Sequence, residues 1–142
     1  GSNLMCDLMF FDRPPWKQYN VILNCIDINS RYVYGVAMTN KSSKTTAEAI
    51  IKVFKHMGKV PDTLQTDSGT EFTGKEFREA IEKAGVKKHL ESDTNNPRKN
   101  SMIERFNRTL GNRIQTYTKN SGNNNWVSQL NTIYKQYNDI EH

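Results

Sequence analysis

Three acidic residues stand out by their positions in the chain. Asp7 interrupts the apolar run LMCDLMFF, Asp67 ends the segment DTLQTD before a sharp Ser-Gly turn, and Glu104 lies near the start of a long helical pattern. An ionised carboxylate is costly to bury without a partner, so Asp7 is unexpected in a purely structural strand. Mg²⁺ prefers carboxylate oxygens, and two such ions can activate the attacking oxygen and stabilise the leaving one in phosphoryl transfer. The three acids are therefore candidate metal ligands and catalytic residues.

Each of these acids also has a purely structural interpretation. Asp7 could point to solvent from a strand whose side chains alternate, and Asp67 could cap the turn that follows it. Glu104 ends the segment SMIE, which matches a capping box, so it could bond back to the start of its helix. Asp27 also ends an apolar strand, but the segment IDINS is typical of turn chemistry alone. Spacing by itself leaves these alternatives open.

Basic residues are concentrated in the segment that contains Glu104. Residues 98–119 hold six basic side chains and one acidic, so this segment carries +5, equal to the net charge of the whole chain. On a helix, four residues of the segment would lie on one flank. They are an acidic residue, a basic residue, a glycine without a side chain and a residue with a side-chain amide: Glu104, Arg108, Gly111 and Gln115. Such a flank suits a phosphate backbone, although a solvated basic face is the alternative.

The remaining patterns predict the elements that position these residues. Apolar or β-branched runs predict strands over 3–11, 20–28, 32–39, 62–67 and 86–90, the second and third forming an antiparallel hairpin. Apparent capping boxes and helical periodicity predict helices over 45–57, 73–84, about 101–117 and 126–137. The polar segment SDTNNPRKN is predicted to be a mobile loop. This order indicates an α/β fold with a mixed sheet flanked by helices.

Composition limits the classes of protein that fit. The 142 residues suit one domain, and 35% hydrophobic with 25% charged residues is typical of a globular protein. No apolar run approaches the ~20 residues of a membrane span, and no secretory signal is evident. The two cysteines, Cys6 and Cys25, lack metal-ligand spacing and lie in apolar runs, which favours buried thiols in a reducing compartment. The three histidines are scattered, which argues against a zinc site.

Several motifs, in order, resemble the integrase core of retroviruses and related mobile elements, from about Leu4 to His142. CDLMFF is similar to the family's first strand with its catalytic aspartate, and VILNCIDINSRYVYGVAM to its second and third strands. TDSGTEF resembles the Thr-Asp-Asn-Gly-x-x-Phe motif, and NNPRKNSMIERFNRTL the Asn-Pro loop with the glutamate-bearing helix. YNDIEH is similar to the family's closing signature. The catalytic residues then fall on Asp7, Asp67 and Glu104.

The sequence departs from the family pattern at a few points. Ser68 stands where asparagine is commoner, and 36 residues separate Asp67 from Glu104, one more than in many retroviral cores; we place the extra residue in 91–96. The insert over residues 12–19, with two prolines, is more like the integrases of Maverick/Polinton elements, virophages or retrotransposons. We expect residues 1–2 to be a tag scar and residues 3–142 to form an isolated catalytic core.

The resemblance implies a ribonuclease H-like fold with a mixed five-stranded sheet. It implies a DDE polynucleotidyl transferase that performs 3′-end processing and strand transfer with two Mg²⁺ or Mn²⁺ ions on the three acids. DNA, as element ends and target duplex, is the implied partner of a homodimer or higher oligomer, with no membrane association. The expected DNA contacts are Lys99, Arg105, Asn107 and Arg108. We expect an intracellular location, in the host nucleus or a nucleoprotein complex. A hydrolytic nuclease of the same fold and an inactive, domesticated binding module remain alternatives.

Overall fold

The protein is represented by a computed structural model that describes residues 2–11, 18–92 and 97–140, and their side chains except those of 92–100. The strands are β1 (Asn3–Phe10), β2 (Val21–Asp27), β3 (Val33–Met38), β4 (Thr63–Asp67) and β5 (Lys88–Ser92). The helices are α1 (Ser43–Met57), α2 (Thr70–Thr73), α3 (Lys75–Ala84), α4 (Pro97–Ser121) and α5 (Leu130–Ile140), with the 3-10 turn η1 (Val127–Gln129). Most of the proline-containing insert, residues 12–17, lies outside the described residues.

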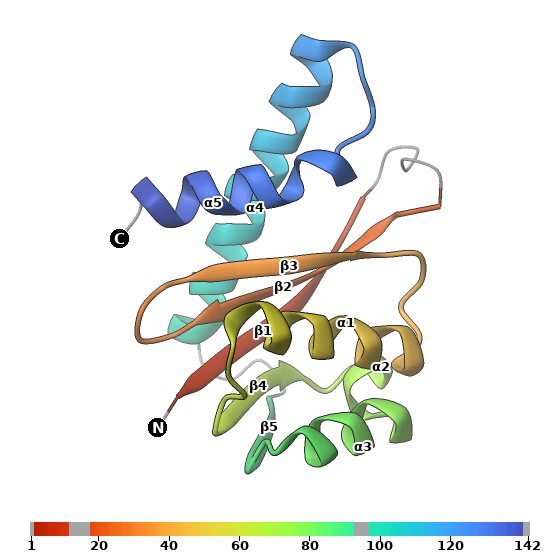
Figure 1. The fold of residues 1–142 in the computed structure, drawn as a ribbon, viewed down its shortest axis with the longest axis vertical. Helices are drawn as coiled ribbons and strands as arrows, with labels where there is room; N and C mark the ends of the chain where they lie inside the picture. The colour runs from red at the N-terminus through yellow and green to blue at the C-terminus, as the bar shows by residue number, and fades with distance from the viewer. Residues whose placement is uncertain (1, 12–17, 93–96, 141–142) are drawn as a thin grey trace.

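The five strands form one mixed sheet in the order β3-β2-β1-β4-β5 (Figure 1). β1 pairs antiparallel with β2, and β2 pairs antiparallel with β3, so the predicted hairpin is confirmed. β4 lies on the other side of β1 and is parallel to it, and β5 is parallel to β4. β1 is therefore the central strand, with antiparallel pairing on one side and parallel pairing on the other.

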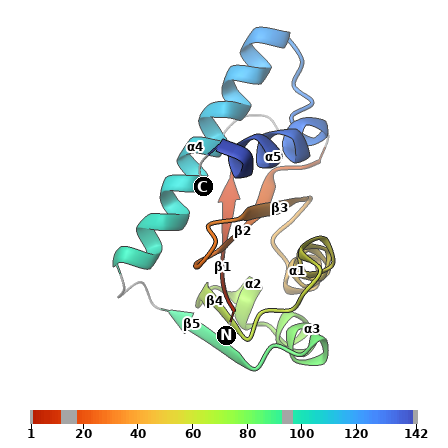
Figure 2. The same cartoon turned by 60° about the vertical axis from the view of Figure 1, so that its left-hand side comes forward.

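Helices cover both faces of this sheet, as predicted. Figure 2 shows α1 and α3 on one side of the strands and α4 on the other. Leu4, Cys6 and Leu8 of β1 join the core beneath α1 and α3. Met5 joins the second core, which contains the buried stripe of α4 and the apolar side chains of α5. Because successive strand residues point to opposite faces, odd-numbered residues of β1 face α4.

Several predicted element boundaries are wrong, for local reasons. α1 begins earlier than expected because Ser42 is its N-cap and accepts a hydrogen bond from the backbone N–H of Thr45. The helix predicted over 73–84 is α3, but it begins at Lys75 with Gly74 as its N-cap, so the capping box predicted at Thr73 is wrong, and the short α2 before it was not predicted. As predicted, α1 ends at Met57 and is followed by Gly58, which adopts the left-handed φ of 74° that favours glycine.

The long helix differs most from the prediction. α4 begins at Pro97, so residues 97–100 of the predicted mobile loop are helical, while residues 93–96 lie outside the described residues. Proline is well suited to a first helical turn, because its missing N–H has no intrahelical partner there. The expected apolar stripe is present, and Ile103, Phe106, Leu110 and Ile114 are all buried. None of the helices in the described ranges combines the length and apolar character that a membrane span requires.

Candidate active site

Asp7 lies on the central strand and faces α4. Met5 and Met9, two residues away on either side, pack with the core that contains α4. The Asp7 side chain is partly buried, and Asn107 of α4 donates a hydrogen bond from Nδ2 to its Oδ2 at 3.3 Å. Asp7 therefore does not simply project into bulk solvent, which was its structural alternative.

Asp67 is the last residue of β4, the parallel neighbour of β1. Paired residues of these strands run from Asn3 with Thr63 to Met5 with Gln65, and beyond this pairing the charge of Asp67 is close enough to Asp7 to raise the pKa of the Asp7 carboxyl. The backbone N–H of Gly69 donates to Oδ1 of Asp67 at 2.8 Å, so the predicted turn contact is present. That bond engages one carboxylate oxygen, so a role in the turn and a role in metal binding are compatible.

Glu104 approaches from the helix that covers this face. Because α4 begins at Pro97, Ser101 lies inside the helix and cannot serve as the cap of a box with Glu104. The capping-box interpretation is therefore wrong. The Glu104 side chain is exposed, and its negative charge is close enough to Asp7 to raise the pKa of that carboxyl.

The electrostatics of Asp7 are those of a buried acid among other acids. Its pKa is raised from 3.8 to about 6, first by burial, then by the charge of Asp67, and to a smaller extent by Glu104. Hydrogen bonds from the Leu8 backbone and the Asn107 side chain lower the pKa and offset only part of this effect. No basic side chain is among the causes, so the described residues supply no cation to balance the charge of Asp7.

The chemistry of these acids fits a divalent ion, although their arrangement is not a closed three-ligand cage. Among the described residues, no three Asp, Glu, His or Cys side chains lie close enough together to hold one metal ion. Asp7 and Asp67 nevertheless supply hard oxygen ligands whose mutual repulsion a divalent cation would relieve. A hard metal ion that keeps several waters requires only one or two carboxylates from the protein.

A chain of hydrogen bonds connects Asp7 to the interior of the protein. Asn24 of β2 donates from Nδ2 to Oδ1 of Asn107 at 2.8 Å, which directs the Nδ2 of Asn107 toward Asp7. The hydroxyl of Tyr134, on α5, donates to Oδ1 of Asn24 at 2.6 Å. Gly35 packs against this junction, and a Cβ there would collide with the Tyr134 hydroxyl and with Asn24. The orientation of Asn107 is thus determined by buried groups on β2 and α5.

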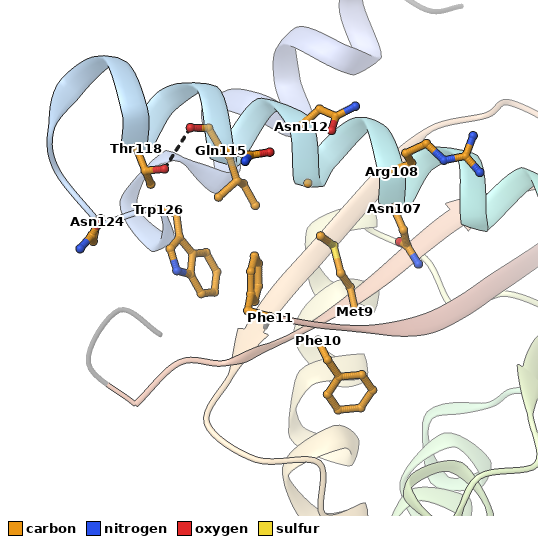
Figure 3. A pocket seen from close by; sticks show the side chains of 12 residues that line it. Met9, Phe10, Phe11, Asn107, Arg108, Asn112, Gln115, Thr118, Asn124 and Trp126 are labelled. Carbon is orange, nitrogen blue, oxygen red and sulfur yellow. Dashed lines mark hydrogen bonds between the residues drawn. The ribbon is translucent and has the colours of Figure 1, made fainter. Parts of the chain in front are cut away.

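The predicted DNA-contacting residues differ in their exposure and in their contacts. Arg105 and Arg108 are exposed on α4, whereas Asn107 is partly buried and engaged with Asp7 and Asn24. Lys99 lies in the first turn of α4, and its side chain is outside the described part. Arg108 lines a pocket between α4 and the end of β1 (Figure 3). Of the expected shared flank, Gly111 and Gln115 line the same pocket as Arg108, whereas Glu104 is not among its lining residues.

Other features of the sequence have structural roles. Asp27 accepts hydrogen bonds at Oδ1 from the backbone N–H groups of Asn29 and Ser30, at 2.9 and 3.0 Å, which confirms turn chemistry. Cys6 and Cys25 are buried free thiols opposite each other on β1 and β2, with their sulfur atoms 2.6 Å apart. The expectation that both cysteines are buried thiols is confirmed, and burial raises the pKa of the Cys6 thiol well above its usual value.

Comparison with known families decides the classification. The family model described as "Integrase core domain" matches residues 2–97, which include β1 through β5 and two of the three candidate acids. The chain belongs to the integrase core domain family. The five-stranded order and flanking helices are those of the ribonuclease H-like integrase core, so the predicted fold class is confirmed.

Individual relatives of this integrase core come from mobile elements and retroviruses. A putative uncharacterized transposon-derived protein of Caenorhabditis elegans is 33% identical over 118 residues, which cover 83% of this chain and 40% of that protein. The Gag-Pro-Pol polyprotein of squirrel monkey retrovirus is 28% identical over 100 residues, covering 70% of this chain and 5% of the polyprotein. The chain thus spans less than half the length of these curated relatives.

Solved structures show the same fold at low sequence identity. The HTLV-2 integrase catalytic core domain in complex with magnesium, in its trimeric form, superposes with a TM-score of 0.79 at 21% identity, covering 97% of this chain and 85% of that one. A chain of the simian T-cell lymphotropic virus intasome gives a TM-score of 0.84 at 19% identity, covering 97% of this chain and 48% of that one.

The hydrogen-bond partners of Asn107 were not singled out from the sequence. Asn24 carried a usable signal, because it is the polar residue in the apolar run VILNCI and is completely buried. Buried amides need partners, so such a residue indicates a network. Tyr134 carried no comparable signal, since a tyrosine in the apolar stripe of a last helix is expected in any core.

Proposed function

We propose that this chain is the catalytic core of a DNA integrase, a metal-dependent polynucleotidyl transferase that performs 3′-end processing and strand transfer. The observation that carries the proposal is the partly buried Asp7 carboxylate, which has Asp67 and Glu104 as its charged neighbours and a pKa raised to about 6. Clustered carboxylates repel one another unless a cation neutralises them, and an acid whose pKa is perturbed by burial and by charged neighbours is a candidate for a functional site.

In this proposal Asp7, Asp67 and Glu104 hold two Mg²⁺ or Mn²⁺ ions. When bound, the ions would supply activation of the attacking oxygen and charge stabilisation at the leaving oxygen. Asn107 holds the Asp7 carboxylate through Nδ2, and its own orientation is fixed by Asn24. Arg108, with Arg105 and Lys99, binds the phosphate backbone. No side chain forms a covalent intermediate, so the protein acts by positioning phosphate and nucleophile.

Relatives support the partners that we assign. The HTLV-2 integrase core has been solved in dimeric and trimeric forms in complex with magnesium, and the simian T-cell lymphotropic virus structure is an intasome. We propose that this chain likewise self-associates and acts on mobile-element or viral DNA ends and a target duplex. The same reasoning assigns it to an intracellular nucleoprotein complex, in the host nucleus when the target is chromosomal.

A metal-dependent assay with branched DNA tests this function. The substrate joins an element end to a target strand, so that a core domain can reverse the joining step. With Mn²⁺, the wild-type chain should release the element end and reseal the target, and Asp7→Asn should do neither. Cleavage without resealing would indicate a hydrolytic nuclease instead, and self-association with no reaction would indicate a binding module.

A further inference from the structure

A pocket of about 410 Å³ lies beside the candidate active site, between α4 and the end of β1. Figure 3 shows Met9 and Phe11 pointing from the strand toward the helix, whereas Phe10 points away. Asn107 lines this pocket and also binds Asp7, so the pocket and the candidate catalytic carboxylate are adjacent. Its volume falls within the range of about 300–1,000 Å³ that is typical of small-molecule sites, which suits one nucleotide and not a duplex.

The inner surface of the pocket is aromatic and apolar. Phe11 stacks on Trp126 with their ring centroids 4.4 Å apart and an interplanar angle of 29°. Trp126 is buried, whereas Phe11 remains partly exposed, so a flat ring could add to this stack. Gly111 and Met9 both line the hollow, and they pack closely, since a Cβ at Gly111 would lie 3.1 Å from the Cε of Met9.

The rim is polar and includes a cation. Arg108 and Gln115 are exposed on α4, and neither side chain has a hydrogen-bond or ion-pair partner within the described part of the chain. A guanidinium is suited to phosphate oxygens. A side-chain amide presents one acceptor and two donors, the set that pairs with the edge of a nucleobase.

We propose that this pocket binds one unpaired nucleobase of the DNA strand that enters the active site. The base stacks on Phe11, its edge meets Gln115, and its phosphate lies on Arg108. A paired base inside a duplex exposes only its edge in a groove, so it could not reach the ring of Phe11. The inference rests on the proposed function, because the DNA strand must pass Asp7 for the neighbouring base to lie here.

Equilibrium binding without metal tests the pocket separately from catalysis. Labelled duplexes with a three-nucleotide single-stranded tail are compared with the same duplexes whose tail is abasic, in EDTA, by fluorescence anisotropy. Stacking of one base on an aromatic side chain predicts about tenfold tighter binding of the tail that carries bases. Gly111→Leu, which fills the hollow and favours the helix, should bring the ratio of the two affinities close to one. The control Asn120→Leu, at an exposed position outside the pocket, should keep the wild-type ratio.

The outcomes separate the pocket from the function. Equal affinities for the two tails in the wild type, no binding of either tail, or a ratio that Gly111→Leu leaves intact would overturn the pocket. If the wild type nevertheless joins branched DNA, the integrase proposal stands without the pocket. If it prefers tails with bases but neither joins nor cleaves, the pocket stands as a single-strand site and the catalytic proposal fails.

Discussion

Asp7 should destabilise the metal-free protein at neutral pH, and Asp7→Asn should remove that effect. Burial and the charges of Asp67 and Glu104 raise the pKa of Asp7 from 3.8 to about 6. The asparagine amide has nearly the same size, keeps an oxygen for the hydrogen bond from Asn107, and carries no charge at any pH. The substitution therefore isolates the electrostatic contribution of one carboxylate.

The size and sign of the effect follow from the raised pKa. Because the folded protein binds this proton more tightly than the unfolded chain, the free energy of unfolding falls as pH rises from about 4 to about 6, and is level above that window. At 1.36 kcal/mol per pKa unit, the difference between 3.8 and about 6 corresponds to an upper limit of about 3 kcal/mol. For a domain of this size, that is about 9 °C in the melting temperature.

Thermal unfolding in EDTA between pH 4 and pH 8 measures this contribution. The melting temperature of Asp7→Asn should equal that of the wild type at pH 4. Above pH 6 it should exceed the wild-type value by a constant amount. Asp139→Asn, which removes an exposed carboxylate on α5, should stay within about 0.5 kcal/mol of the wild type throughout. Millimolar Mn²⁺ should then raise the wild-type midpoint and leave Asp7→Asn almost unmoved. A stability difference that is independent of pH, or equal Mn²⁺ shifts in both proteins, would refute this reasoning.

Three further substitutions test the remaining parts of the site. Glu104→Gln should keep the melting temperature, because the side chain is exposed, but abolish joining of branched DNA; normal joining would exclude Glu104 from the metal site. Arg108→Ala should lower the log–log salt slope of duplex binding by about 0.9, whereas Arg113→Ala, whose guanidinium lies 5.6 Å from the Tyr137 ring, should change it less; equal losses would indicate a diffuse basic surface. Tyr134→Phe leaves Oδ1 of Asn24 without its buried donor, so Mn²⁺ affinity, measured by titration, should fall about fivefold; unchanged affinity would make this hydrogen bond purely structural.

The sequence was most informative where a local pattern determines the structure. The run around Asp7 predicted a strand, and its two-residue alternation is what turns Asp7 toward α4. Gly58 and Gly85 marked the ends of α1 and α3, because both adopt positive φ. These features depend on neighbours within a few residues, so they are readable without the fold.

Features that depend on distant contacts could not be predicted in the same way. The start of α4 at Pro97 was missed because its first residues, PRKN, carry no apolar stripe. β5 begins later than expected, at Lys88, because its limits are set by pairing with β4. The bond between Tyr134 and Asn24 joins residues 110 apart, and no local pattern reports such a contact.

The central claim is that Asp7, Asp67 and Glu104 form one metal site for phosphoryl transfer. Anomalous diffraction from crystals soaked in Mn²⁺, recorded at the manganese absorption edge, tests it most directly. We expect a manganese peak bridged by the Asp7 and Asp67 carboxylates, and a second peak that also contacts Glu104 when a DNA end is bound. Manganese bound only elsewhere, or no peak between Asp7 and Asp67 at a concentration that stabilises the protein, would contradict the assignment.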